Sequence, residues 1–408
     1  MSTSTMKHQE KAFSPLMAGE TESDTLNGVP QASDSHRLVL HPGARQLLVL
    51  ISATGTKPGR FNLWKYADIL PCHKLYLRAP TNDWYQQGVP GLGADFKETA
   101  ENIRRLAAGC RAEKIYTCGS SMGGYGAILF GLELDASVLA FSPEIVLKLP
   151  FSRSYKMMPE GVQMTAPDLR QKLAAAQSPV VIYTGEMDPV DLYCAATVRN
   201  LPSVQIVTFR DDEHTVMRTL FQTDRLETTL REFVEDKPLP TIMEKGSALD
   251  IAGYPRSFYR GWQYFLKKED DLAIKELRKA IAAYPISARA NFFMAKLMLR
   301  NSNPEKAREH AAMAVAMTPN FVEHRVFFAH CLRMTGALEG AMYNHMKILE
   351  TWPDTPQSHF DLGQIYFQKG QIEKARLQFS EAVRLEPSNP AYVKKLEKLN
   401  KLYLSMPR

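Results

Sequence analysis

Ser121 stands in the segment Gly-Ser-Ser-Met-Gly-Gly, residues 119–124, which has the residue types needed for a nucleophile. A short apolar run typical of a buried strand precedes the segment, and small and apolar residues at helical spacing follow it. A G-x-S-x-G sequence in that setting indicates a sharp strand-to-helix turn that exposes the serine hydroxyl. Gly119 and Gly123 occupy the positions where such a turn has no room for a Cβ. We therefore predict that Ser121 is a nucleophile and that the backbone N–H of Met122 donates to an oxyanion.

Two further polar side chains follow apolar runs that also have the character of buried strands. Asp188 follows the run 180–184, and His214 follows the run 204–209. These types in the order serine, acid, histidine are typical of a nucleophilic triad. In that interpretation Ser121 attacks an acyl carbonyl, His214 takes its proton, and Asp188 orients the imidazole.

The choice of acid stays open at this point. Asp191 and Glu186 lie close to Asp188 in the sequence, and either could replace it. His41 and His73 lie in the same half of the chain, but neither follows a late strand. The alternative for the histidine of the triad is a surface residue beside three acids.

Two loops at other strand ends supply candidate binding groups. Thr54 follows an early strand and is the expected second backbone donor of the oxyanion hole. A later loop contains Asn82, Trp84 and Tyr85, which could stack on and hydrogen-bond a polar ring such as a sugar. The alternative is that the two aromatic residues only anchor a long loop.

Apolar runs and helical patterns alternate through the first half of the chain, which predicts an α/β fold with a doubly wound, mostly parallel sheet. Ligands bind such sheets at the carboxyl ends of the strands. Strands are expected at 37–40, 46–52, 74–78, 114–118, 137–141, 180–184 and 204–209. Helices are expected at 61–70, 95–108, 122–132, 167–176, 189–200 and 215–234.

Residues 37–235 resemble the α/β-hydrolase superfamily through the serine turn at 119–124, the turn at Asp188 and His214. The resemblance implies an esterase-type serine hydrolase that works through an acyl-enzyme on Ser121, with an acyltransferase as an alternative. The polar loop favours an acyl or acetyl ester of a polar or saccharide substrate. Neither a metal nor a cofactor is expected.

The second half of the chain is repetitive. Prolines stand at 285, 319, 353 and 387, and alanines at 273, 307, 341 and 375, each series with a period of 34 residues. This period is that of tetratricopeptide repeats, helix pairs that stack into a solenoid. We predict four repeats and a capping helix over 254–408, joined by a linker at 236–253. The resemblance implies a protein partner, and a catalytically silent scaffold is the alternative to an enzyme.

Composition sets the remaining expectations. The Ser/Thr-rich residues 1–36 are expected to form a disordered tail. Five cysteines at unrelated spacings argue for a reducing, cytoplasmic location, and no apolar run is long enough for a transmembrane helix. Residues 254–408 hold 24 Lys/Arg and 15 Asp/Glu, a net +9, whereas the rest carries −3. We interpret this excess as solvated helix faces, with an acidic partner surface as the alternative, and expect no nucleic-acid partner.

The two halves are expected to have separate roles. Because the candidate site lies at strand ends and the repeats follow the last helix, we expect the chemistry to be complete within residues 37–235. The linker is long enough either to be flexible or to let the first repeat pack on the first half. In this hypothesis the repeats set where the enzyme acts.

Overall fold

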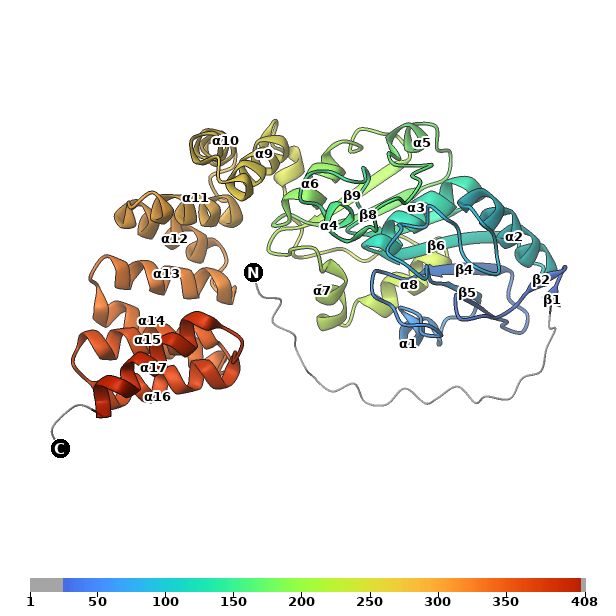
Figure 1. Ribbon diagram of the computed structural model, residues 1–408. Helices are drawn as coiled ribbons and strands as arrows, with labels where there is room; N and C mark the ends of the chain where they lie inside the picture. The colour runs from blue at the N-terminus through green and yellow to red at the C-terminus, as the bar shows by residue number, and fades with distance from the viewer. Residues whose placement is uncertain (1–24, 405–408) are drawn as a thin grey trace.

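The computed structural model describes residues 25–404 and has two parts. In Figure 1 the sheet and the helices that cover it lie on the right, and a column of stacked helices lies on the left. The first part ends at Val234 and the second begins at Tyr254. The segment between them is the predicted linker.

The first part contains a seven-stranded sheet in the order β3-β5-β4-β6-β7-β8-β9. Strand β3 pairs antiparallel with β5, and the other neighbouring strands are parallel, so the sheet is mixed but mostly parallel, as predicted. The strands are β3 His36–Val39, β4 Gln46–Ile51, β5 His73–Leu77, β6 Lys114–Ser120, β7 Ser137–Phe141, β8 Val180–Gly185 and β9 Val204–Phe209.

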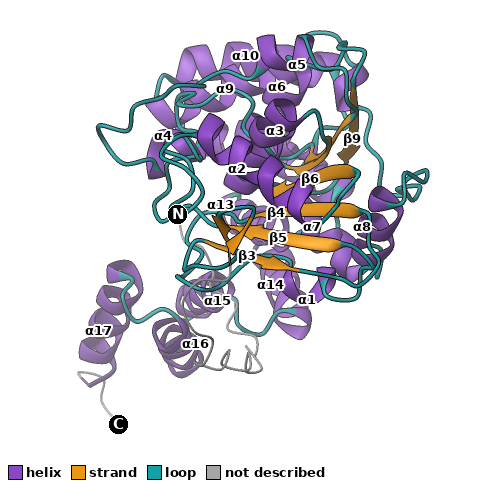
Figure 2. Cartoon of the chain, turned by 90° about the vertical axis from the view of Figure 1, so that its right-hand side faces the viewer, coloured by secondary structure: helices purple, strands orange, loops and turns teal. Residues whose placement is uncertain are grey.

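Helices cover both faces of this sheet (Figure 2). Side chains alternate along β4, so Val49 and Ile51 join one apolar core while Leu48 and Leu50 join the other. The helices of this part are α1 Trp64–Ala67, α2 Phe96–Gly109, α3 Met122–Leu134, α4 Arg153–Met157, α5 Arg170–Ala174, α6 Pro189–Ala196, α7 Val216–Gln222 and α8 Leu226–Val234. The single helix expected at 215–234 is thus two helices, separated at residues 223–225.

Part of the predicted tail is folded. Residues 1–24 lie outside the described residues, but the prediction is wrong for residues 25–36. There, β1 Thr25–Leu26 pairs with β2 Val29–Pro30, and His36 begins β3. Arg105 of α2 donates to the carbonyl of Asn27 at 3.0 Å. This short hairpin is therefore held against the sheet part of the chain.

The second part is an array of antiparallel helix pairs with a final single helix, as the 34-residue period predicts. The alanines of the period, such as Ala273 and Ala375, have no exposed surface, because their small side chains let paired helices approach. The helices are α9 Tyr254–Lys267, α10 Asp270–Ala283, α11 Ala288–Arg300, α12 Pro304–Met317, α13 Val322–Met334, α14 Leu338–Thr351, α15 Pro356–Gln368, α16 Ile372–Leu385 and α17 Pro390–Leu404.

The linker packs against the sheet part. Lys245 forms an antiparallel bridge with Phe209 at the end of β9, and Gly246 N donates to the carbonyl of Thr208 at 2.8 Å. The 3-10 helix η1 Ala248–Asp250 follows. The amide of Ala248 donates to the buried carboxylate of Glu186 at 2.6 Å. The linker is therefore tied to the edge strand at several points.

The first repeat packs directly on α6. Leu192 and Ala195 of α6 share one buried apolar cluster with residues of the repeats, including Tyr254 and Phe258. The ring of Tyr193 on α6 stacks on Tyr259 of α9 with centroids 4.6 Å apart. Of the two arrangements left open by the length of the linker, the structure has the packed one. Within the described part of the chain, no helix is both long and apolar enough to cross a membrane.

Two helical glycines of the repeats give a matched test of this packing. A Cβ on Gly363 would lie 2.6 Å from the ring of Phe379, whereas a Cβ on Gly340 would meet only Leu332 at 3.8 Å. We expect Gly363→Ala to lower the free energy of unfolding by about 1–3 kcal/mol through overpacking. Gly340→Ala should be neutral or stabilising by up to about 1 kcal/mol, because alanine favours helix. Thermal unfolding followed by circular dichroism measures both, and equal midpoints would contradict close helix pairing.

Candidate active site

Ser121 occupies a strained turn between β6 and α3. Its φ of 58° and ψ of −122° are unfavourable for a residue with a Cβ. A Cβ on Gly119 would lie 2.2 Å from the carbonyl oxygen of Gly123, and a Cβ on Gly123 would lie 2.2 Å from the carbonyl oxygen of Ile51. Both glycines are therefore required sterically. The backbone N–H of Ser121 donates to Phe141 of the neighbouring strand at 2.8 Å, which fixes the turn.

The turn after β4 lies beside this serine, because Ile51 of β4 pairs with Gly119 of β6. Thr54 is in this turn and is partly buried. Asn62 and Asn82 hold the turn from either side: their side-chain oxygens accept from the amides of Ala53 at 2.6 Å and Gly55 at 3.3 Å. Met122 is the first residue of α3. The two expected oxyanion donors, Thr54 and Met122, thus lie on adjacent segments at the carboxyl ends of β4 and β6.

The carboxylate that contacts His214 belongs to Asp191, and Asp188 is not its hydrogen-bond partner. His214 Nδ1 is 2.6 Å from Asp191 Oδ2. Asp191 lies in the first turn of α6, with its side chain fully buried. Burial and the neighbouring Asp188 raise the pKa of this carboxyl, against the opposing effect of His214 and Arg153. The alternative that the sequence left open for the acid is therefore the arrangement found.

Asp188 has a different position, at the N-terminus of α6. Its Oδ1 accepts from the amides of Val190 and Asp191, and its Oδ2 accepts from Arg153 at 2.9 Å. Asp188 was the natural choice from the sequence because it precedes a proline at the helix start, and that position makes it a helix cap. Burial alone would raise its pKa, but Arg153 and His214 lower it to about 2.

Arg153 is the residue of this cluster that sequence reasoning missed. Its guanidinium lies 2.9 Å from Asp188 and 3.6 Å from Asp191, so it neutralises charge at the start of α6. The backbone amide of Arg153 donates to the buried carboxylate of Glu144 at 2.7 Å, which positions α4. No motif marks this arginine, since it is 35 residues from the nearer aspartate in the sequence and begins the short helix α4.

The same cluster has ligand types that could hold a metal ion. Oxygen and nitrogen atoms of Asp188, Asp191 and His214 lie within 4.8 Å of one another. However, Arg153 already provides a positive charge next to both carboxylates, and one carboxylate oxygen of Asp188 caps a helix. These contacts favour an ion-paired carboxylate pair over a metal centre.

The serine and the histidine are not hydrogen-bonded to each other. His214 Nε2 is buried and has no hydrogen-bond partner among residues 25–404. Glu186, the other alternative acid, is turned away toward the linker, where Ala248 and Thr208 donate to it. The structure thus brings His214 to Asp191 and leaves the second imidazole nitrogen available. Hydrogen bonds between a nucleophile and its base are often long without substrate and shorten when a substrate is bound.

The hypothesis that Trp84 and Tyr85 contact a substrate is wrong. Both side chains have no exposed surface. The hydroxyl of Tyr85 donates to the carbonyl of Ser52 at 2.6 Å, and its ring packs on Phe130. These residues anchor the loop, the alternative that the sequence also allowed. Asn82 is half-buried and supports the turn that carries Thr54.

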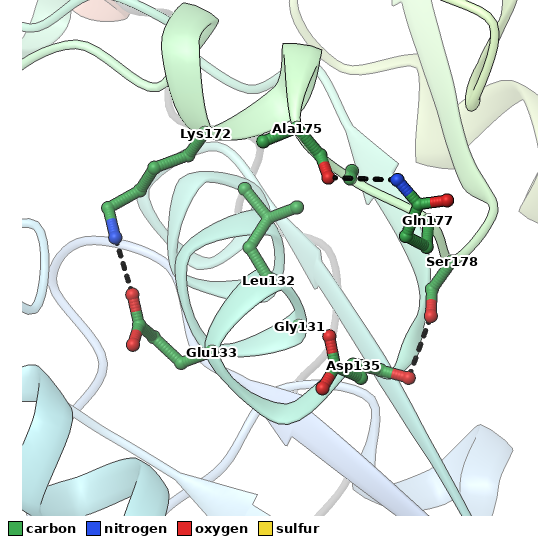
Figure 3. Close-up of a pocket in the computed structure, with 9 residues that line it drawn as sticks. Gly131, Leu132, Glu133, Asp135, Lys172, Ala175, Gln177 and Ser178 are labelled. Atoms are coloured by element: carbon green, nitrogen blue, oxygen red, sulfur yellow. Dashed lines mark hydrogen bonds and ion pairs between the residues drawn. The ribbon is translucent and has the colours of Figure 1, made fainter.

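A cavity of about 200 Å³ lies near the C-terminal end of α3. Figure 3 shows its lining, in which Lys172 pairs with Glu133 and Ser178 donates to the carbonyl of Asp135. Ser121 precedes the first residue of the same helix, so this cavity is at the opposite end of α3 from the candidate nucleophile. It is therefore not the space in which an acyl group would meet Ser121.

Comparison with known proteins identifies the repeats. Two family models described as tetratricopeptide repeat match residues 271–320 and 356–389. The curated protein CTR9 homolog of Arabidopsis thaliana is 28% identical over 135 residues, which are 32% of this chain. That stretch is 12% of the relative, so the match concerns a small part of a much longer protein. The C-terminal part of the chain therefore carries tetratricopeptide repeats.

The solved structures to which this chain is similar include MamA and YrrB. MamA from Desulfovibrio magneticus is 15% identical with a TM-score of 0.32, covering 35% of this chain and 81% of its own. YrrB, described as a tetratricopeptide-repeat protein with an unusual peptide-binding site, is 17% identical with a TM-score of 0.34, covering 52% of this chain and 93% of its own.

The depressed pKa of Asp188 predicts a defined pH dependence of stability. A carboxyl with a pKa of about 2 in the folded protein and about 4 when unfolded contributes about 3 kcal/mol at pH values above 4. This contribution is lost as the pH falls from about 4 through about 2. We expect Asp188→Asn, which retains a capping oxygen, to be less stable than wild type at pH 7. The difference in thermal midpoint should shrink as the pH falls and vanish below about pH 2.

The comparison with the variant reports on this carboxyl together with its effect on Asp191, because the other titrating groups are present in both proteins. A difference in midpoint that stays as large below pH 2 as at pH 7 would show that the variant acts through packing. Equal midpoints at pH 7 would show that the ion pair with Arg153 contributes no net stability.

Proposed function

We propose that this protein binds a protein partner through its tetratricopeptide repeats and hydrolyses an ester through Ser121. Repeats of this class present extended surfaces for peptides and proteins. The observation that carries the catalytic half of the proposal is the strained turn at Ser121, at the same sheet edge as the His214–Asp191 pair. Proteins retain backbone strain of this kind mainly at functional sites.

Three features support a fold of the α/β-hydrolase type for the first part. Ser121 follows the central strand β6, and Gly119 and Gly123 on either side of it lie in close contact with backbone atoms. The acid follows β8 and the histidine follows β9, in the chain order expected of that superfamily. The turn after β4, where a second oxyanion donor is expected, adjoins the serine turn.

The proposed chemistry uses each group in one role. Ser121 Oγ attacks the acyl carbon and its proton passes to His214 Nε2. Asp191 accepts the hydrogen bond of Nδ1–H and stabilises the imidazolium. The alcohol leaves with the proton from His214, and water then releases the acid from Ser121. An acceptor hydroxyl in place of this water would make the same acyl-enzyme an acyltransferase.

The structure weakens the earlier preference for a saccharide ester. That preference depended on Trp84 and Tyr85, which are buried and cannot stack on a substrate. The proposal is therefore limited to a carboxylic ester, without a sugar component.

A catalytically silent scaffold is the second candidate. It is favoured by the missing hydrogen bond between His214 and Ser121, and by the location of the family matches within the repeats. In that case the chain would act only by binding its partner, and the turn at Ser121 would have no catalytic role.

A fluorophosphonate probe separates the two candidates, because it reacts only with an activated serine. We expect wild-type protein to be labelled and Ser121→Ala to be unlabelled at an unchanged thermal midpoint. Mass spectrometry should place the adduct on Ser121. No labelling of folded wild-type protein would favour the scaffold.

The two aspartates provide a matched pair for the triad assignment. Asp191→Asn should lower the rate of small-ester hydrolysis by about 10⁴-fold, as for a triad whose histidine loses its carboxylate. Asp188→Asn keeps the helix cap and should retain most of the activity. Initial rates with p-nitrophenyl acetate measure both, after circular dichroism has shown that both variants fold. A larger loss of rate in Asp188→Asn than in Asp191→Asn would assign to Asp188 the role of orienting His214.

A further inference from the structure

Buried polar atoms without a hydrogen-bond partner gather near the carboxyl ends of β7 and β8. Ser142 Oγ and Thr184 Oγ1 have no partner among residues 25–404, and the same holds for Asp191 Oδ1 and His214 Nε2. Leaving a buried polar atom unpaired is unfavourable, so folded proteins contain few such atoms. Their presence around the candidate acid and base indicates groups that hydrogen-bond to a bound molecule.

Ser142 combines this unpaired hydroxyl with a strained backbone. It directly follows β7, and it has no exposed surface. Its φ of 47° lies in the left-handed region, which suits glycine and strains a residue with a Cβ. The side chain makes no hydrogen bond that would offset this strain, so glycine would fit the fold better here. Strain of this kind is kept mainly at functional sites.

The position of Ser142 is between the candidate nucleophile and the candidate acid. In the sheet, β7 lies between β6, which leads to Ser121, and β8, which leads to α6. The carbonyl of Phe141, the residue before Ser142, accepts from the amide of Ser121 at 2.8 Å. On the other side, the amide of Ser142 donates to the carbonyl of Tyr183 on β8 at 2.7 Å. Ser142 is thus tied to both neighbouring strand ends.

The segment after Ser142 is also held in place. Glu144 is buried, and its carboxylate accepts from the amides of Arg153 at 2.7 Å and Ser154 at 3.1 Å. The side chain of Arg153 in turn pairs with Asp191, the partner of His214. The backbone that carries the Ser142 hydroxyl is therefore fixed on both sides, as a group that orients a reactant must be.

The second half of the proposed reaction needs an oxygen nucleophile that gives a proton to His214 Nε2. Once the alcohol has left, Nε2 has lost its proton and can accept another. Water has two protons, so it can donate one to Nε2 and the other to a neighbouring oxygen. Ser142 Oγ is such an acceptor, and no described residue competes for it. An alcohol has one hydroxyl proton and would leave this acceptor unused.

We propose that the Ser142 hydroxyl holds the water that hydrolyses the acyl-enzyme, and that it thereby favours hydrolysis over acyl transfer. This inference rests on the proposed function. The water oxygen bonds to the acyl carbon, one of its protons passes to His214 Nε2, and the carbonyl oxygen takes the negative charge. The bond from that carbon to Ser121 Oγ then breaks as the carbonyl re-forms. Oγ takes the proton from Nε2, and the acid leaves.

The test separates formation of the acyl-enzyme from its breakdown in the full chain. Each protein is mixed with p-nitrophenyl acetate and freed of substrate by rapid gel filtration, and the acetyl group on Ser121 is followed by mass spectrometry. We expect Ser142→Ala to slow loss of the acetyl group by about tenfold, the effect of one lost hydrogen bond. The rate of the first p-nitrophenol release should change less than about twofold, because water takes no part in that step.

Two further variants show whether the hydroxyl itself is responsible. Ser142→Gly also removes the hydroxyl but relieves the strain at this φ, so it should slow deacetylation as much as alanine does. It also serves if Ser142→Ala does not fold. Ser137→Ala removes a buried hydroxyl at the opposite end of β7 and should behave like wild type. Wild-type deacetylation by Ser142→Gly, or equal slowing by Ser137→Ala, would overturn the inference.

Methanol as a competing nucleophile tests the preference for water. The ratio of methyl acetate to acetate should rise by about tenfold in Ser142→Ala, because only water loses a hydrogen bond. An unchanged ratio, with both products formed more slowly, would contradict the selection of water. It would show instead that Ser142 holds an acceptor hydroxyl, as an acyltransferase requires.

Fluorophosphonate labelling keeps this inference separable from the proposed function. Absence of labelling in folded wild-type protein would contradict the proposed function and this inference with it. Labelling of wild type, together with equal loss of the acetyl group from wild type and Ser142→Ala, would contradict the role of Ser142 alone.

Discussion

The packing of α6 on the first repeat is the contact on which the arrangement of this protein depends. The two aspartates of the candidate site lie at the start of α6, and Leu192 and Ala195 of the same helix share an apolar cluster with the repeats. A helix of eight residues has little stability of its own. Its position, and with it that of Asp191, is therefore set by what it packs against on both sides.

This packing changes the expected relation between the two halves. The sequence suggests a catalytic part complete within residues 37–235 and repeats that only direct it to a target. In the structure the linker bonds to β9, the first repeat covers α6, and Arg289 pairs with the neighbour of His214. The repeats thus contribute to the surroundings of the candidate base, and a partner bound to them would lie close to it.

Patterns of neighbouring residues predicted the serine turn and the repeats, because local geometry determines both. The serine turn follows from the two glycines that a turn without room for a Cβ requires, and the repeats follow from a period that helix pairing imposes. The acid could not be chosen in the same way. Asp188 and Asp191 both lie at the start of α6, and their roles depend on Arg153, which begins the short helix α4 and is distant in the sequence.

Burial explains the prediction that failed at the loop of Trp84 and Tyr85. Aromatic residues beside polar ones at a strand end suit either a binding surface or an anchor, and composition alone does not separate these. The sequence period has a similar limit. Counting marks Tyr259 and Trp262 as positions of the first repeat, but it does not show that the sheet part covers them.

The claim that the repeats support the candidate site is tested most directly by loosening the contact in the full chain. Tyr259→Ala with Trp262→Ala removes the rings that face the sheet part, and Phe327→Ala is the matched change two repeats away. Hydrogen exchange measured by mass spectrometry reports on residues 189–196, and the rate of fluorophosphonate labelling reports on Ser121. The account predicts faster exchange in α6 and slower labelling for the double variant only. Unchanged labelling, with faster exchange confined to α9, would show that the site stands without the repeats.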